Sequence, residues 1–196
     1  MMVDNLNVSR EVKQALLNYQ NLLLKWNKAI NLISRNSEKD IWERHVLDSL
    51  QLLKYIDFSD NILDIGSGGG FPGIVLSIGG VKNAVLVESD KKKSAFLARA
   101  AKFSSNKIVI IDERVDEKFT MNCDVLTLRG FSSINNIFKL TKGIKIQKKI
   151  LLLKGKSYDQ EIAEAQKYWL FDINLHDSIT SREGKIVEIS NIKKLI

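Results

Sequence analysis

The most informative chemical feature of the sequence is a glycine-rich loop that follows a short apolar run. Residues 61–73 read N-I-L-D-I-G-S-G-G-G-F-P-G, so that Asp64 is followed by five glycines within nine residues. Glycines this dense behind a strand predict left-handed backbone conformations and a close approach by another molecule. In proteins that alternate strands and helices, that molecule is usually a nucleotide-like cofactor at the end of the first strand.

Two cofactors are compatible with this loop. Gly68, Gly70 and Gly73 match the dinucleotide pattern G-x-G-x-x-G, and Glu88, 20 residues after Gly68, would suit a ribose diol. However, the carboxylate of Asp64 would repel a pyrophosphate, and residues 64–67 separate the strand from the match. S-adenosylmethionine has no phosphate and carries an ammonium and a sulfonium. The acid-then-glycines pattern also resembles motif I of the class I methyltransferases, so we favour S-adenosylmethionine over a dinucleotide and its oxidoreductase chemistry.

The elements that must position this loop follow from hydrophobic periodicity. Short apolar runs at 62–65, 84–88, 107–111, 124–128 and 150–153 alternate with predicted helices near 72–79, 91–103, 132–141 and 157–168. This alternation predicts a parallel sheet that is buried on both faces. Segments 170–179 and 185–192 are joined by only five residues, which predicts an antiparallel hairpin. We therefore predict an α/β fold of the class I methyltransferase (Rossmann-like) type, a mostly parallel seven-stranded sheet ending in that hairpin.

The N-terminal part of the chain is predicted to be helical. Apolar residues recur there at helical spacing, and Ser9 is a suitable N-cap; the residues are Val12, Leu16, Tyr19 and Leu23. A second helical stretch is expected from about Ser37 to Tyr55, with acidic residues in its first turns. We predict a helical extension over residues 1–58 and an S-adenosylmethionine-dependent methyltransferase domain over residues 59–196.

Charge and composition narrow the class of partner. The formal net charge is +7, and residues 125–158 contain eight basic and no acidic residues. A stretch of one sign predicts a surface that faces a polyanion, although a composition rich in Lys, Ile and Asn can raise the charge without any function. The single cysteine, Cys123, and the lack of an apolar run of transmembrane length predict a soluble cytoplasmic protein without membrane association. No metal site is predicted.

Missing motifs limit which atom could be methylated. Residues 128–131, Leu-Arg-Gly-Phe, lack the Asn/Asp-Pro-Pro-aromatic tetrapeptide that is common in enzymes acting on exocyclic amines. Methylation of pyrimidine C5 needs a cysteine nucleophile, but Cys123 opens the predicted fourth strand at the end away from the loop. Purine N7 has a free lone pair and loses no proton on methylation. Such an acceptor needs no general base, so we assign no catalytic acid or base and expect catalysis by proximity and in-line orientation.

Several separate motifs together resemble one bacterial family. They are Asn31-Leu32-Ile33, Arg44-His45-x-x-Asp48-Ser49-Leu50, the loop 64–73, Glu88-Ser89-x-x-Lys92-Lys93-x-x-Phe96-Leu97, Asp124-Val125-x-x-x-Arg129-Gly130 and Lys154-Gly155. In this order they resemble the family known as RsmG or GidB over nearly the whole chain. The resemblance implies transfer of a methyl group from S-adenosylmethionine to N7 of one guanine in the 16S ribosomal RNA of the small subunit.

The expected cofactor site combines the resemblance with the chemistry of the loop. The resemblance implies cofactor contacts at Gly66, Phe71, Val115, Asp116 and Arg129. The loop and the second strand add three residues: Asp64 near the methionine end, Gly68, and Glu88 at the ribose. The chain departs from the family pattern twice, with Arg114-Val115-Asp116 in place of Arg-Ala-Glu and Arg129-Gly130 in place of Arg-Ala. The shorter acid would shift the adenine contact.

RNA contacts are expected on the same edge of the sheet. Arg129, Lys154 and Lys156 follow the fourth and fifth strands and are candidates to bind the RNA backbone. Arg44, His45 and Asp48 could orient the acceptor, although Arg44 and Asp48, four residues apart, could simply pair with each other. The expected partner is 16S ribosomal RNA or the small ribosomal subunit, and the chain is expected to be a monomer. A methyltransferase of small molecules or proteins and a non-enzymatic RNA-binding module remain alternatives.

Overall fold

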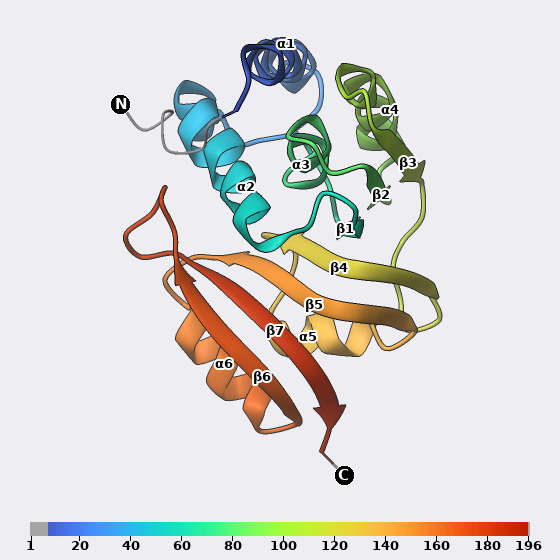
Figure 1. The fold of residues 1–196 in the computed structure, drawn as a ribbon, viewed down its shortest axis with the longest axis vertical. Helices are drawn as coiled ribbons and strands as arrows, with labels where there is room; N and C mark the ends of the chain where they lie inside the picture. Colours follow the sequence, from blue (N-terminus) through green and yellow to red (C-terminus); the bar gives the residue numbers. More distant parts are fainter. Residues whose placement is uncertain (1–7, 196) are drawn as a thin grey trace.

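The computed structural model describes residues 8–195 and consists of one seven-stranded sheet flanked by helices (Figure 1). The strand order is β3-β2-β1-β4-β5-β7-β6, and only the pairs that involve β7 are antiparallel. This confirms the predicted parallel sheet that ends in an antiparallel hairpin. The strands are β1 (Asn61–Ile65), β2 (Asn83–Val87), β3 (Lys107–Ile111), β4 (Met121–Arg129), β5 (Ile144–Lys154), β6 (Trp169–Asp177) and β7 (Lys185–Lys194).

The helices fall into two groups (Figure 1). One group contains α1 (Arg10–Asn27), α3 (Gly73–Ile78), α4 (Lys91–Ala100) with its 3₁₀ continuation η5 (Ala101–Phe103), and the helical segment from Arg35 to Tyr55. The other contains α5 (Ile134–Leu140) and α6 (Tyr158–Gln166), which pack beside β5, β7 and β6. Helix α1 begins as predicted, because the side chain of Ser9 accepts a hydrogen bond from the backbone N–H of Val12.

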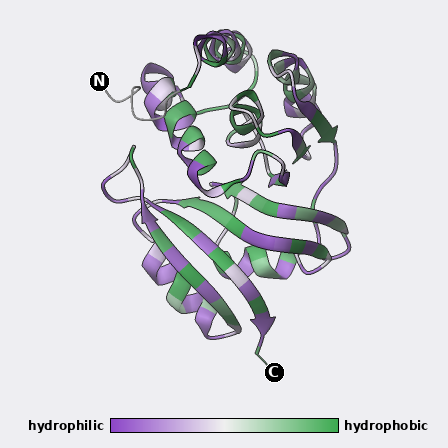
Figure 2. Cartoon of the chain, in the orientation of Figure 1, coloured by the Kyte–Doolittle hydropathy of each residue, from purple (hydrophilic) through white to green (hydrophobic). Residues whose placement is uncertain are grey.

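Two hydrophobic cores lie on opposite faces of the sheet. Ile62 of β1 packs with α1, α3 and α4, whereas the next residue, Leu63, packs with α5 and α6. This alternation is the pleat of a strand that is buried on both sides. In Figure 2, hydrophilic and hydrophobic residues alternate along β6 and β7, where the sheet is less covered. Leu16 and Leu23 of α1 belong to the same core as Ile62, so the N-terminal helices and the sheet share one packed interior.

The predicted boundary between the helical extension and the methyltransferase domain, after residue 58, therefore stays a prediction. Residues 1–7 of the predicted extension lie outside the described residues. None of the helices in the described range 8–195 is long and apolar enough to cross a membrane.

The strands β4 and β5 are longer than their predicted apolar runs. Strand β5 begins at Ile144, six residues before the predicted run, and β4 begins at Met121 with a register shift between Cys123 and Val125. The early part of β5 reads I-K-I-Q-K-K and is buried on one face only. An apolar-run criterion detects only the part of a strand that is buried on both faces, which explains the difference.

The segment predicted as one helix from about Ser37 to Tyr55 is helical but irregular. It consists of the 3₁₀ helix η2 (Arg35–Asp40), the π-helix η3 (Trp42–Leu47), the short α2 (Asp48–Leu50) and the 3₁₀ helix η4 (Gln51–Tyr55). π-Helical turns are rare and are often found at functional sites. The irregularity places several polar groups of this segment against the carboxyl end of β4, as described below.

Candidate active site

The glycine-rich loop after β1 adopts the left-handed conformations that its sequence predicts. Gly66, Gly68 and Gly70 have φ values of 70°, 53° and 88°. A Cβ atom at Gly66 would lie 2.4 Å from Cδ2 of Phe131, so a side chain there would be strained and would also collide with that ring. The loop is further fixed by the N–H of Gly66, which donates to the carbonyl of Val87 at 2.9 Å. Both conformation and space therefore require glycine at position 66.

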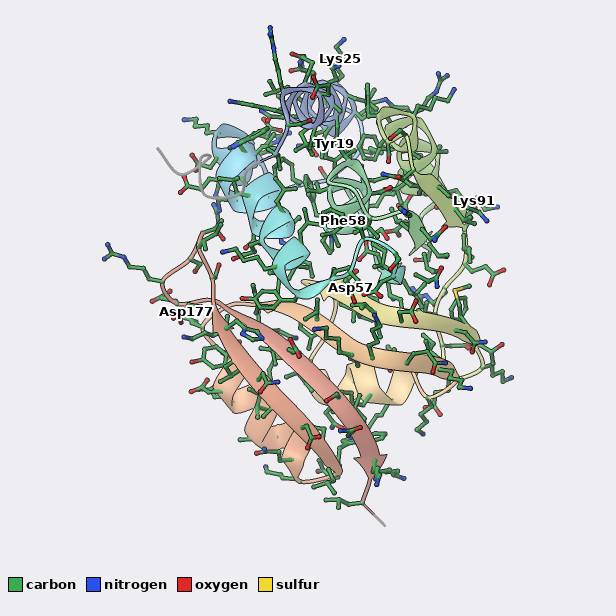
Figure 3. All side chains as sticks on the ribbon, viewed as in Figure 1. Tyr19, Lys25, Asp57, Phe58, Lys91 and Asp177 are labelled. Atoms are coloured by element: carbon green, nitrogen blue, oxygen red, sulfur yellow. The ribbon has the colours of Figure 1, made fainter. Side chains whose placement is uncertain are left out.

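Helix α1 supports this loop from the other side. The hydroxyl of Tyr19, which is completely buried, donates a hydrogen bond to the carbonyl of Gly69. Figure 3 labels Tyr19 on the inner side of α1 and Lys25 on its outer side. The sequence identified Tyr19 only as part of an apolar helix face, because its distant partner leaves no local signal.

Asp64 is the penultimate residue of β1 and is completely buried. Its Oδ2 accepts a hydrogen bond from the N–H of Gly73 at 3.1 Å, and its Oδ1 accepts one from the hydroxyl of Thr127 at 3.2 Å. Burial raises the pKa of Asp64 to about 7, although hydrogen bonds from Ser67, Gly73 and Thr127 oppose the shift. The carboxyl group thus connects β1, α3 and β4, and a nearby cation would favour its ionised form.

Glu88 follows β2 and contacts the same loop. Its Oε2 accepts a hydrogen bond from the N–H of Gly68 at 2.8 Å, and its Oε1 accepts one from the N–H of Asp90 at 2.9 Å. The side chain is buried, with 8% exposure. These bonds hold the carboxylate at the carboxyl edge of the sheet beside the glycine loop.

A pocket of about 550 Å³ opens beside Glu88. Its volume falls within the range of about 300–1,000 Å³ that is typical of small-molecule sites. Four of the predicted cofactor residues line it, namely Gly66, Glu88, Val115 and Asp116, and so does Phe131. The other four lie outside its lining: Asp64, Gly68, Phe71 and Arg129. Phe131, two residues beyond β4, is one of the wall residues that the sequence analysis did not assign to the cofactor site.

Arg129 ends β4 and contacts both the π-helix η3 and the first residue of α2. Its Nε pairs with Oδ2 of Asp48 at 3.0 Å, its Nη1 lies 2.6 Å from Nδ1 of His45, and its Nη2 donates to the carbonyl of Arg44 at 2.7 Å. The guanidinium carbon lies 5.8 Å from the ring centre of Phe71, in cation–π range. The structure thus brings Arg44, His45 and Asp48 to Arg129, and Asp48 pairs with this arginine.

The ring of His45 is neutral in this environment. Burial, together with the positive charges of Arg129 and Arg44, lowers the pKa of His45 to about 3. Its ring stacks on Phe71 with centroids 4.9 Å apart. Because Nδ1 faces an arginine N–H and must accept, the proton resides on Nε2, which has no hydrogen-bond partner among residues 8–195. His45 therefore acts here as an acceptor for Arg129.

A second pocket, of about 480 Å³, also opens at the end of β4. Arg129 and Gly130 line the second pocket, while Phe131 lines the first. The remaining walls of the second pocket are mostly polar and come from the helical segment, the end of β5, the connection between β6 and β7 and the start of β7: Arg44, Asp48, Leu153, Lys154, Gly155, Ser178, Thr180, Ser181, Gly184 and Lys185. Ligands bound in the two pockets would therefore both lie beside residues 129–131.

The structure divides the basic stretch 125–158 between two ends of the sheet. Lys154 lies at the carboxyl end of β5, donates to the carbonyl of Ser132 at 2.6 Å and pairs with Glu161 at 2.7 Å. Lys156 is exposed just beyond it. Lys148 lies toward the opposite end of β5 and pairs with Asp57 and Asp60. Of the predicted RNA contacts, Lys156 is thus the exposed one, and Lys154 is already paired.

Cys123 is buried near the start of β4, and burial raises the pKa of its thiol to about 12. A thiol in this state is not a nucleophile at neutral pH. Residues 8–195 contain no group of three or more His, Cys, Asp or Glu side chains that could hold a metal ion.

Comparison with known proteins identifies the family. Residues 12–190 match the model of the GidB family, described as rRNA small subunit methyltransferase G. The chain belongs to the GidB family. Its GidB relatives include the ribosomal RNA small subunit methyltransferase G of Rickettsia akari (strain Hartford), 52% identical over 97% of this chain and 100% of the relative. The protein of the same name from Rickettsia bellii (strain OSU 85-389) is 53% identical over the same shares.

Solved structures confirm the fold that the sequence predicted for this GidB chain. A ribosomal protein L11 methylase from Lactobacillus delbrueckii subsp. bulgaricus has a TM-score of 0.58 at 12% identity and covers 74% of this chain and 76% of its own. A TehB-like SAM-dependent methyltransferase from Corynebacterium glutamicum has a TM-score of 0.56 at 14% identity, over 89% and 98% of the two chains. At such identities the likeness shows the class I methyltransferase fold alone.

Proposed function

We propose that this GidB chain transfers a methyl group from S-adenosylmethionine to N7 of a specific guanine in 16S ribosomal RNA. The observation that carries the proposal is the pair of pockets at the carboxyl edge of the sheet, whose linings include the consecutive residues 129–131, in a member of this family. In open α/β sheets, ligands bind at this edge. One pocket would hold the donor and the other the acceptor.

The first pocket fits the nucleoside part of S-adenosylmethionine, which supplies an electrophilic methyl group on a sulfonium when bound. Glu88 would exchange its bond from the Gly68 N–H for the ribose hydroxyls, and Val115 with Asp116 would contact the adenine. Gly66 lines this pocket, and a side chain there would displace the Phe131 ring, which forms part of the same wall. Asp64 would interact with the methionine ammonium from beneath the loop, and Arg129 retains two guanidinium N–H groups for a carboxylate. Phe71 supports Arg129 from below.

The second pocket contains no side chain that is placed as a general base. Asp48 is bonded to Arg129, and the Nδ1 lone pair of His45 is directed at the same arginine. Purine N7 requires no base, because its lone pair attacks the methyl group directly. Asp48 is the one acidic residue of this lining and is already paired with Arg129, so we assign it no direct role in charge stabilisation. Proximity and in-line orientation would therefore supply the catalysis.

The substrate would be 16S ribosomal RNA or the small ribosomal subunit, bound by a monomeric enzyme in the cytoplasm. Arg44, in the lining of the second pocket, and Lys156, which follows its lining residue Gly155, are exposed and would meet the RNA backbone together with Arg129. Lys154 would reach phosphate only by leaving Glu161.

The test uses labelled S-adenosylmethionine with small subunits, and separately with naked 16S RNA, from cells that lack the gene. We expect one labelled 7-methylguanosine per RNA, located by nuclease mapping and mass spectrometry. Subunits from cells that carry the gene are the control and should accept little label. No label in either RNA, or label only in protein or small molecules, would contradict the proposal. RNA binding without any affinity for S-adenosylmethionine would favour a binding module instead.

A further inference from the structure

The connection between β6 and β7, residues 178–184, forms a wall of the second pocket. Ser178, Thr180, Ser181 and Gly184 all line it. Loops of this kind are usually the mobile parts of a fold, since they bury little apolar surface. This one is instead held against the helical segment that surrounds Arg129.

Asp48 makes contacts in two directions. Its Oδ2 accepts from Nε of Arg129 at 3.0 Å. Its Oδ1 accepts from the hydroxyl of Thr180 at 2.7 Å and from Nε2 of Gln51 at 2.9 Å. The carboxylate is only 15% exposed and is bonded at both oxygens, so its geometry is strongly constrained. One side chain thus links the arginine at the end of β4 with the wall of the neighbouring pocket.

Gln51 makes a parallel connection one helical turn further along. Its Oε1 accepts from the N–H of Ile179 at 2.9 Å, and its Nε2 contacts the hydroxyl of Ser178 at 3.3 Å as well as Asp48. The side chain is buried, with 1% exposure. Gln51 holds the backbone of the connection, whereas Asp48 alone reaches both the connection and Arg129.

We propose that Asp48 is a positioning residue, which holds the 178–184 wall and the guanidinium of Arg129 in one arrangement and so sets how the acceptor base meets the methyl donor. The proposal rests on the proposed function, because it assigns the second pocket to the acceptor. Asp48 would act through Arg129 and Thr180 and would need no proton transfer of its own. A misplacement of about 1 Å remote from the reacting atoms can cost about 100-fold in rate.

Two substitutions test the contacts of Asp48 with Arg129 and with Thr180 separately. Asp48→Asn weakens the bond to Arg129 and leaves an amide oxygen that Thr180 can still reach. Thr180→Val keeps the shape of the wall and removes its hydroxyl donor to Asp48. We expect kcat to fall about 10- to 100-fold for Asp48→Asn and less for Thr180→Val, with Kd for S-adenosylmethionine changed less than about 3-fold. Glu164→Gln, which breaks the exposed ion pair with Lys167 on α6, is the matched control and should keep its kcat.

Three measurements distinguish positioning from damage to the fold. Calorimetric titration with S-adenosylmethionine should give one site per chain in every variant, so that kcat is counted per folded site. Trypsin cleavage after Arg182, an exposed residue of the wall, should be faster in Thr180→Val than in wild type when followed by mass spectrometry. The double variant should lose less activity than the two single losses combined, because both changes interrupt the connection from Thr180 through Asp48 to Arg129.

The proposal is overturned if Asp48→Asn and Thr180→Val both keep kcat within about 2-fold of wild type, or if their effects on kcat add in the double variant. It is also overturned if the losses of kcat are accompanied by matching losses of affinity for S-adenosylmethionine or of the number of binding sites per chain. If Asp48→Asn does not fold, Thr180→Val with the cleavage assay decides alone. Failure of the proposed function is a separate result, since the wild-type protein would then methylate no RNA.

Discussion

Among single residues, Gly66 and Phe131 have the tightest fit in the candidate cofactor site. Gly66→Ala places a methyl group in a backbone with φ of 70° and within 2.4 Å of the Phe131 ring. Because that ring lines the cofactor pocket, the variant should bind S-adenosylmethionine at least about 10-fold more weakly and lose about 1 kcal/mol or more of stability from the strained φ.

The control is Gly155→Ala, where an added Cβ has no neighbour within 4 Å and the φ is not positive. Calorimetric binding of S-adenosylmethionine and thermal unfolding of both variants are the measurements. Equal cofactor affinity in Gly66→Ala and wild type would contradict the proposed location of the cofactor.

Asp64 leads to a prediction about pH. Burial raises its pKa to about 7, above its usual value, so its protonated form is favoured in the folded protein. The stability this contributes is complete below the unfolded pKa and is lost as pH rises through about 7. An ammonium bound above the loop would draw the carboxyl into its ionised form. Binding of S-adenosylmethionine at pH 7 should therefore release a fraction of a proton, and at pH 9 almost none.

Titration calorimetry in two buffers with different ionisation enthalpies measures this release. Asp64→Asn should abolish the buffer dependence, whereas Asp124→Asn, at the far end of the sheet, should retain it. A wild-type binding enthalpy that is the same in both buffers at pH 7 would show that Asp64 does not change its protonation when the cofactor binds.

Among the elements, α1 supports the glycine loop through the hydrogen bond that the hydroxyl of Tyr19 donates to it. Tyr19→Phe removes that donor and leaves the carbonyl of Gly69 without this partner in a buried site. The loss should destabilise the protein by about 1–3 kcal/mol. It should also weaken S-adenosylmethionine binding, because the loop is less firmly held. Chemical denaturation measures the first effect and calorimetry the second. Tyr168→Phe, at a half-exposed ring, is the control and should change neither.

The elements also show which structural features could be predicted from the sequence alone. Local periodicity predicted the order of strands and helices and the hairpin, because each of these depends on neighbouring residues. It also placed Gly66 and Glu88 beside one loop. It could not predict that Asp48 would meet Arg129, 81 residues away, or that Thr180 would join them. Such contacts depend on how separate elements pack. The π-helical turn was equally hidden, because its sequence has ordinary helical character.

For the whole molecule, the division of the basic stretch decides which end should face RNA. Lys145 and Lys156 both belong to residues 125–158 and are exposed, but they lie near opposite ends of β5. A count of charges along the sequence does not distinguish them. The proposed function does, because both pockets open at the carboxyl end of the sheet and Lys156 follows Gly155 in the lining of the second pocket.

Salt dependence of RNA binding tests this assignment. Each phosphate contact that is lost reduces the slope of log affinity against log salt concentration by about 1. Lys156→Gln should therefore bind 16S RNA more weakly at low salt and show this smaller slope, because it removes one exposed cation beside the acceptor pocket. Lys145→Gln makes the same change of charge at the other end and should leave affinity and slope unchanged. Filter binding over a range of potassium chloride concentrations gives both slopes. A smaller slope for Lys145→Gln, with none for Lys156→Gln, would place the RNA at the opposite end of the sheet and contradict the proposed acceptor pocket.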